Sequence, residues 1–434
     1  MKQKILFILL LLLFVAGANA NDRFPKPDFE SGYQYPEEHY IVPNEALWTT
    51  VDIVMLTLLM SFVALAVLKR RTRKPIIWVS VISVAYFGFF REGCVCSVGA
   101  VQNVALTLVD SNYVMPISVM FFFMLPIVFA FLFGRVFCAG VCPFGALQEL
   151  VNIKNYKLSK AVSSVLGILP WIYLIFAVLF AVTKSRFIIC RFDPFIGIFR
   201  FGGDFELIIF GVMLLVIAIF IGRPFCRFLC PYGVLLSLFS RVSIWNIQLT
   251  KKECINCELC HNACPVDAIK PPFDNKVKES RIQGVKRMIM YFAVLPLMIL
   301  SGALLMRHLS EDLSRVHKDV RLYDMVIEYE NIHVGAGLAP AHVHDLEAFY
   351  IHGGAIEDLT KKYNLIQADY KFWSTIAGLL LGLVIGLVLI DLSTKRTRKL
   401  YEIDHAECVD CGRCFSYCPH NKTNISSQHE ESNL

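Results

Sequence analysis

The sequence is poor in charge. Only 18% of its 434 residues are Asp, Glu, Lys or Arg, whereas soluble globular proteins carry about a quarter. The formal net charge of +6 is modest and gives no reason to expect a nucleic-acid partner. Hydrophobic residues make up 56% of the chain and gather in runs that approach the ~20 residues of a membrane span. An ordinary soluble domain is therefore excluded, and an all-α polytopic membrane protein is expected.

A haem-binding signature is missing from the polar stretch Arg307–Lys371. No C-x-x-C-H motif accompanies the histidines of this stretch, so it lacks the signature of covalent haem attachment. The apolar segments hold no histidine that could ligate a haem. Six histidines are scattered through the polar stretch Arg307–Lys371, which is expected to be a solvated helical domain. The chain has 15 cysteines in tight groups beside Pro and Gly, and this grouping indicates metal binding rather than disulfides.

Seven apolar segments are expected to span the membrane. They lie near Leu47–Leu68, Ile76–Phe90, Pro116–Phe133, Val165–Val182, Phe205–Ile221, Met288–Met306 and Phe372–Asp391. Basic clusters at 69–74 and 395–399 are both expected in the cytoplasm, because an even number of spans separates them. The segment Lys184–Asp204 fits this orientation less well, since it carries four basic residues on the expected periplasmic side.

The N-terminus resembles a secretory signal. Lys2 and Lys4 precede an apolar stretch from Ile5 to Val15, and Ala18-Asn19-Ala20 forms a cleavage site. The alternative is an uncleaved first span. The expected divisions are a signal peptide (1–20), a periplasmic segment (21–46), a transmembrane core (47–245), a first cysteine motif (246–285), a transmembrane helix (286–306), a periplasmic insertion (307–371), a last transmembrane helix (372–392) and a second cysteine motif (393–434).

One motif of the core occurs twice. Gly134-Arg135-Val136-Phe137-Cys138 and the following Cys142-Pro143-Phe144-Gly145 return as Gly222-Arg223-Pro224-Phe225-Cys226 and Cys230-Pro231-Tyr232-Gly233. Each copy follows an apolar segment and is preceded by cysteines expected near the outer surface. Two units in the same orientation predict two parallel repeats related by a pseudo-twofold axis along the membrane normal, as in some transporters.

Two further cysteine runs have the spacing of bacterial ferredoxins, C-x-x-C-x-x-C-x-x-x-C-P. They are Cys254, Cys257, Cys260 and Cys264, and Cys408, Cys411, Cys414 and Cys418. Thiolates are soft ligands that suit iron, and this spacing predicts two [4Fe–4S] clusters in a cytoplasmic ferredoxin-like α+β module. Structural zinc sites usually use two separated C-x-x-C pairs instead. When two such runs fold together, each lends its fourth cysteine to the other cluster. Cys418 then completes the first set and Cys264 the second; the alternative is two self-contained sites.

The remaining cysteines form two smaller groups. If the twofold axis exists, Cys138, Cys142, Cys226 and Cys230 converge at the inner surface, where four thiolates suffice for a further iron–sulfur or metal centre. The alternative is a pair of structural turns whose thiols bind nothing. Cys94, Cys96 and Cys190 form an outer group of three. They are either partly joined in a disulfide or part of a redox centre whose fourth ligand is Asp193 or a partner's residue.

These motifs resemble the NapH/NosR-type membrane iron–sulfur proteins, which are polyferredoxin-like. The resemblance rests on the twin Gly-Arg-x-Phe-Cys motifs and on the run that begins at Cys254, and it covers about Val79–Pro272 and Cys408–Pro419. It implies electron transfer between a quinol or cytoplasmic donor and a periplasmic reductase system. The flavin-binding periplasmic domain of NosR has no counterpart between the signal and the first span. A separate flavoprotein, or a cytochrome, is therefore expected as partner.

The sequence thus predicts an electron-transfer subunit of an oxidoreductase system in the bacterial inner membrane, rather than a stand-alone catalyst. A redox-sensing regulator or assembly factor of a periplasmic reductase is the first alternative. A transporter is the second, and it rests only on the span count and the repeat. Few ionisable residues lie within the expected spans, which argues against transport.

Overall fold

The structure is a computed structural model that describes residues 46–93, 96–249, 254–273, 281–331, 340–351, 353–394, 398 and 400–419. The expected signal peptide, the periplasmic segment before Ala46 and Cys94 lie outside these residues.

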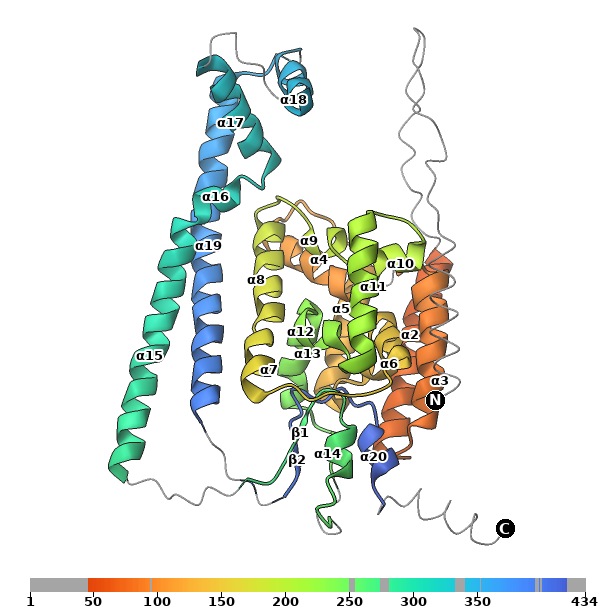
Figure 1. Ribbon diagram of the computed structural model, residues 1–434. Helices are drawn as coiled ribbons and strands as arrows, with labels where there is room; N and C mark the ends of the chain where they lie inside the picture. Colours follow the sequence, from red (N-terminus) through yellow and green to blue (C-terminus); the bar gives the residue numbers. More distant parts are fainter. Residues whose placement is uncertain are drawn as a thin grey trace.

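Regular structure in the described residues is almost entirely helical (Figure 1). The elements are α2 (Ala46–Leu68), α3 (Lys74–Ser83), η1 (Val84–Phe90), α4 (Ser97–Val109), α5 (Ile117–Phe133), η2 (Phe137–Val141), α6 (Pro143–Val151), α7 (Lys160–Leu166), α8 (Leu169–Val182), α9 (Ile188–Arg191), α10 (Ile196–Arg200), α11 (Phe205–Phe220), α12 (Pro224–Phe228), α13 (Pro231–Arg241), α14 (Leu259–Ala263), β1 (Ile269–Lys270), α15 (Arg281–His308), α16 (Ser310–Ser314), α17 (Lys318–Asn331), α18 (Pro340–Ile351), α19 (Ile356–Ser393), β2 (Glu402–Ile403) and α20 (Arg413–Tyr417). The labels η1 and η2 denote short π-helical turns.

The chain is a multi-pass membrane protein. Four helices of the described residues are long and apolar enough to cross a bilayer: Leu47–Leu68, Lys160–Val182, Ile282–His308 and Ile356–Ser393. Four shorter apolar helices accompany them: Lys74–Phe90, Ser97–Val109, Ile117–Phe133 and Phe205–Phe220. All seven segments expected from the sequence are therefore helical, and α4 is an additional helix that was not expected.

The twin cysteine motifs form the centre of the core. Gly134 ends α5 with a φ of 83°, and Pro143 and Pro231 open α6 and α13 at the first helical turn, where proline's missing N–H costs nothing. Every residue from Arg135 to Glu149 is buried. The surrounding helices α2, α5, α8 and α11 enclose these short elements (Figure 1). The motifs are thus packed inside the protein and not displayed on its surface.

A long hairpin of α15 and α19 stands beside this core (Figure 1). Gly378, Gly382 and Gly386 recur every fourth residue of α19, and a side chain at Gly378 or Gly382 would collide with the backbone of α15 near Gly302 and Met298. Small residues at this spacing let two membrane helices approach closely. The hairpin meets the core through α19, which packs on α8, while α16, α17 and α18 extend it away from the core.

The two ferredoxin-type motifs fold together into one module. β1 pairs antiparallel with β2, with Ile269 opposite Ile403. The short helices α14 and α20, which carry the central cysteines of the two runs, pack against each other. This module lies at one end of the core, below α12 and α13 in Figure 1.

Candidate functional site

The thiols of the two ferredoxin-type runs interleave. Burial raises the pKa of Cys260, and the nearby thiols of Cys257, Cys254 and Cys418 raise it further. Cys418 belongs to the second run, so the thiols near Cys260 come from both runs.

The second run likewise receives a cysteine from the first run. Burial and then Asp410 raise the pKa of Cys408, and Cys414 and Cys264 add to the effect. Cys264 lies in turn beside Cys411. The fourth cysteine of the first run therefore lies among the thiols of the second, which is the arrangement expected when two runs exchange their last ligands.

The four inner cysteines also meet. Cys138, Cys142, Cys226 and Cys230 line one small internal cavity, although they come from two motif copies. Tyr232 and Val98 close this cavity on other sides. The sequence-based expectation that the two C-x-x-x-C-P motifs converge agrees with this geometry.

Polar groups surround these thiols. The side-chain amide of Gln148 lies 3.6 Å from Sγ of Cys226, and Nη2 of Arg135 lies 4.0 Å from Sγ of Cys138. The backbone N–H of Gly233 donates to Sγ of Cys230 across 3.3 Å. Burial raises the pKa of Cys226 to about 11, partly opposed by the positive charge of Arg223. Without a bound metal such thiols stay protonated, whereas the donors around them suit negatively charged sulfur.

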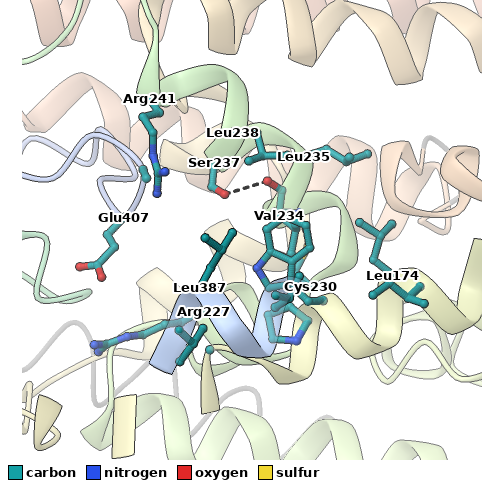
Figure 2. Close-up of a pocket in the computed structure, with 18 of the residues that line it drawn as sticks. Leu174, Arg227, Cys230, Val234, Leu235, Ser237, Leu238, Arg241, Leu387 and Glu407 are labelled. Atoms are coloured by element: carbon teal, nitrogen blue, oxygen red, sulfur yellow. Dashed lines mark hydrogen bonds between the residues drawn. The ribbon is translucent and has the colours of Figure 1, made fainter. Parts of the chain in front are cut away.

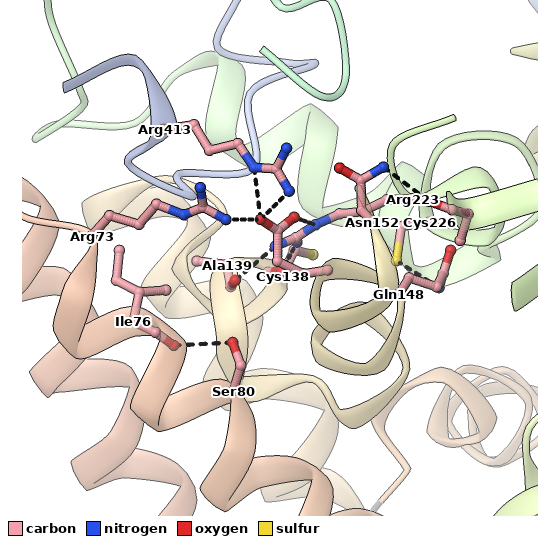
Figure 3. A network of polar contacts seen from close by, with 12 residues as sticks. Arg73, Ile76, Ser80, Cys138, Ala139, Gln148, Asn152, Arg223, Cys226 and Arg413 are labelled. Atoms are coloured by element: carbon pink, nitrogen blue, oxygen red, sulfur yellow. Dashed lines mark hydrogen bonds and ion pairs between the residues drawn. The ribbon is translucent and has the colours of Figure 1, made fainter. Parts of the chain in front are cut away.

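A buried carboxylate links the inner site to the module (Figure 3). Glu149 on α6 accepts hydrogen bonds from Arg73, Arg223 and Arg413 at 2.6, 3.1 and 2.8 Å. Arg223 also donates to the carbonyl oxygens of Cys138 and Ala139. One carboxylate thus joins α3, the two copies of the twin motif and the second ferredoxin-type run.

The outer group is only partly described. Cys96 and Cys190 are both free thiols, so no disulfide joins them, and Cys94 is outside the described residues. Burial raises the pKa of Cys96 to about 12, and the neighbouring Asp193 and Cys190 contribute to the rise. Asp193 is buried and accepts a hydrogen bond from the N–H of Phe195. The structure therefore brings Cys96, Cys190 and Asp193 together.

Tyr232 lines the inner cavity and also senses the outer group. Its hydroxyl donates to the carbonyl of Phe123 at 2.6 Å. Burial raises the pKa of Tyr232, and the thiols near enough to raise it further are Cys138, Cys230, Cys142 and Cys96. Thiols of both groups therefore lie near enough to Tyr232 to affect the pKa of its hydroxyl.

The donor set fits iron–sulfur clusters. Among the described residues, no three Cys, His, Asp or Glu side chains converge closely enough for a single metal ion. A cluster needs no such convergence, because its iron and sulfide atoms separate the four thiolates. The buried Nε of Arg135 has no hydrogen-bond acceptor among the described residues. Such a donor suits the negative charge that a cluster would bring.

A large cleft borders the inner site. It has a volume of about 1650 Å³ and lies between α8, α13 and α19. Leu174, Leu235 and Leu387 line its apolar part, while Arg227 and Glu407 lie at its polar end (Figure 2). Cys226 and Cys230 also border the cleft, so an occupant would lie next to the inner thiols.

Sequence reasoning missed several residues of this site. It gave no role to Glu149, Arg135, Arg223 or the cleft. The two arginines are conspicuous because they take the same place in both motif copies. Glu149 is an acidic residue in an otherwise largely apolar stretch that follows the first copy, and this was the available signal.

Comparisons with known proteins support the cluster chemistry. A family described as "4Fe-4S binding domain" matches residues 115–160 and 204–248, which contain the twin motifs. A second family with the same description matches residues 247–270, which contain the first ferredoxin-type run. No solved structure matches the chain.

Curated relatives align with about a third of the chain. The regulatory protein NosR of Stutzerimonas stutzeri is 36% identical over 155 residues, which are 32% of this chain and 21% of NosR. Protein NirI of Paracoccus denitrificans is 33% identical over 151 residues, which are 32% of this chain and 22% of NirI. YccM of Escherichia coli, provisionally named as an electron transport protein, is 30% identical over 156 residues, or 32% of this chain and 43% of YccM.

The chain thus spans about a fifth of the length of NosR and NirI. The segments matched by the two family descriptions contain the twin motifs and the first ferredoxin-type run, and the predicted resemblance to NosR is confirmed. The chain is an iron–sulfur membrane protein that resembles NosR and NirI.

Proposed function

We propose that this protein transfers electrons across the bacterial inner membrane, from a quinol or cytoplasmic donor to a periplasmic acceptor of a respiratory reductase system. The observation that carries the proposal is the convergence of Cys138, Cys142, Cys226 and Cys230 on one cavity beside the ferredoxin-type module. A bound [4Fe–4S] cluster supplies reversible one-electron transfer. The residues of the chain hold, insulate and orient such centres.

The proposed ligand sets use twelve cysteines. Cys254, Cys257, Cys260 and Cys418 hold one cluster; Cys408, Cys411, Cys414 and Cys264 hold a second; Cys138, Cys142, Cys226 and Cys230 hold a third. The interleaving of the two runs supports the exchange of fourth ligands.

The proposed topology has seven spans in two parallel repeats, with both ferredoxin-type motifs in the cytoplasm and the insertion 307–371 in the periplasm. The basic clusters at 69–74 and 395–399 support this orientation. The module and the α16–α18 extension lie at opposite ends of the structure, which agrees with it (Figure 1).

The path toward the periplasm runs through packed aromatic rings. A bilayer core is ~30 Å thick, too wide for one efficient transfer. The Phe195 ring lies 5.2 Å from that of Phe225 and 5.3 Å from that of Phe144, measured between centroids. Phe225 adjoins Cys226, and Phe195 follows Asp193 by two residues. The outer group of Cys94, Cys96 and Cys190 is the proposed exit, with Asp193 as a further ligand and a flavoprotein or cytochrome as acceptor.

The proposed entry point for quinol is the cleft. Its apolar walls suit a lipid-soluble carrier, and the polar end offers Arg227 and Glu407 to the quinol hydroxyls (Figure 2). Oxidation of a quinol releases two electrons and two protons. Because an iron–sulfur cluster accepts one electron at a time, the two electrons leave in sequence through the adjoining cysteine-bound centre.

The test is anaerobic reduction of the protein in liposomes by a soluble quinol, followed through iron–sulfur absorption. Leu387→Trp fills the cleft and should slow reduction about tenfold, which corresponds to ~1.4 kcal/mol. Leu389→Trp is the matched control, because Leu389 is exposed on the same helix but does not line the cleft. Equal rates for both variants would place quinol oxidation elsewhere.

A redox-sensing regulator is the second candidate, because NosR is named a regulatory protein. A sensor takes up electrons once, whereas an electron-transfer protein turns over. Sustained quinol oxidation in the presence of a periplasm-side oxidant such as ferricyanide supports transfer. A single stoichiometric reduction supports sensing.

A further inference from the structure

Arg135 and Arg223 take matching places around the inner cavity. Each follows the glycine that opens one motif copy, and both side chains are buried, with exposures of 6% and 0%. Each reaches the last glycine of the other copy. A methyl group on Gly145 would lie 3.7 Å from Nη1 of Arg223, and one on Gly233 would lie 3.2 Å from Nη2 of Arg135. The motifs therefore exchange their arginines across the site.

The charge around the two arginines differs. Four residues after Gly145 stands Glu149, whose Oε2 accepts from Nε of Arg223. Four residues after Gly233 stands Ser237, whose hydroxyl instead donates to the carbonyl of Val234. The correspondence between the two copies thus breaks at the one position that would neutralise Arg135.

The guanidinium of Arg135 has only neutral and thiol hydrogen-bond partners among the described residues. Its Nη1 donates to the carbonyl of Ala406 at 3.1 Å, and its Nη2 lies 4.0 Å from Sγ of Cys138. Asp410 accepts from the backbone N–H of Arg135 and interacts with its charge, but the Asp410 carboxylate forms no ion pair with the guanidinium. The Nε of Arg135 is buried without an acceptor among the described residues. A buried charged donor left in this way costs free energy, so the site is built for an anionic partner.

We propose that Arg135 is a positioning residue whose charge, held in no ion pair, raises the reduction potential of a cluster held by Cys138, Cys142, Cys226 and Cys230. The inference rests on the proposed function, since it requires a cluster at these cysteines. Reduction adds negative charge in surroundings of low dielectric. A nearby fixed positive charge and N–H donors to sulfur stabilise that added charge. Arg223 has a smaller effect because its guanidinium is held in an ion pair with Glu149.

The test is a redox titration of the full chain in detergent, followed by EPR. The inner signal is the one lost in the Cys142→Ser/Cys230→Ser double variant. Arg135→Gln should lower its midpoint so that the ratio of oxidised to reduced centre changes at least about tenfold at a given potential, or ~59 mV for one electron. Arg135→Lys keeps the charge and should shift the midpoint less.

Ser237→Glu is the second variant, and it leaves Arg135 in place. It puts a carboxylate where Glu149 stands relative to Arg223, so the midpoint should fall. Ser237→Ala is its matched control and should leave the midpoint unchanged. If the Arg135→Gln variant does not assemble its inner cluster, the midpoint measured in Ser237→Glu decides the test.

An inner signal whose midpoint stays constant in Ser237→Glu, and in Arg135→Gln where that variant assembles, would overturn the role of Arg135 while the proposed cluster stands. A wild-type protein without any signal that depends on Cys142 and Cys230 would overturn the proposed inner cluster, and the inference with it.

Discussion

Arg413, in the second ferredoxin-type run, donates from Nε to Oε1 of Glu149 on α6 across 2.8 Å. Burial alone would raise the pKa of Glu149, but the charges of Arg413, Arg223 and Arg73 lower it to about 2. The carboxylate is therefore ionised at neutral pH and holds together segments that lie far apart in the sequence. It fixes the ferredoxin-type module against the inner cysteines.

Glu149→Gln should destabilise the protein strongly. The substitution leaves Arg223 and Arg413 buried without an anion, which typically costs about 3–5 kcal/mol. Thermal unfolding in detergent, followed by circular dichroism, measures the effect as a lower Tm. Asp358→Asn is the control, because Asp358 pairs with Lys361 at the surface and both side chains are exposed. A Tm equal to that of the control would contradict the role given to Glu149.

The stability that Glu149 provides should disappear in acid. Its pKa lies below the usual 4.5, so its contribution is complete above pH 4.5 and is lost as the pH falls toward about 2. A pKa lowered by this much corresponds to about 3 kcal/mol in the free energy of unfolding. The Tm difference between wild type and Glu149→Gln, measured on metal-free protein, should shrink between about pH 5 and about pH 2.5. A Tm difference that stays constant over this pH range would be evidence against the stabilising role of ionised Glu149.

Gly382→Leu should separate the hairpin helices. Any side chain at Gly382 meets the backbone of α15 at Met298 and Ile299, and overpacking of this kind costs about 1–3 kcal/mol. Leu379→Ala is the matched control, because Leu379 is partly exposed on the same helix. The Tm in detergent should fall for the glycine variant and change little for the control. Similar Tm values for both would mean that the close approach contributes little stability.

Reporter fusions test the proposed orientation. Cytoplasmic reporters joined after Asp274 and Asn433 should be active, and a periplasmic reporter joined after Gly353 should be active. The basic clusters beside the first and last spans provide the physical reason. Periplasmic activity at Asp274 or Asn433 would reverse the arrangement.

The ligand positions could be predicted from the sequence because cluster chemistry fixes their spacing. The meeting of Cys142 and Cys230 could also be foreseen, since it follows from the repetition of one motif in one orientation. The ion-pair network could not. Arg73, Arg223 and Arg413 are far apart in the chain, and no periodicity marks them as neighbours of Glu149.

Two features of the membrane region were also beyond sequence patterns. The helix α4 has only 13 residues and is capped by Cys96, whose thiol accepts from the N–H of Gly99. Its residues are too few to stand out in the sequence as a span. The cleft lies between α8, α13 and α19, and a gap between helices leaves no mark on hydrophobic periodicity.

Iron and sulfide analysis of anaerobically purified protein tests the central claim most directly. With three four-iron clusters per chain, the wild type should contain about twelve iron and twelve sulfide atoms, and the Cys142→Ser/Cys230→Ser double variant about eight of each. Eight iron atoms in both proteins would reduce the twin motifs to structural turns. Zinc in place of iron would contradict the account as a whole.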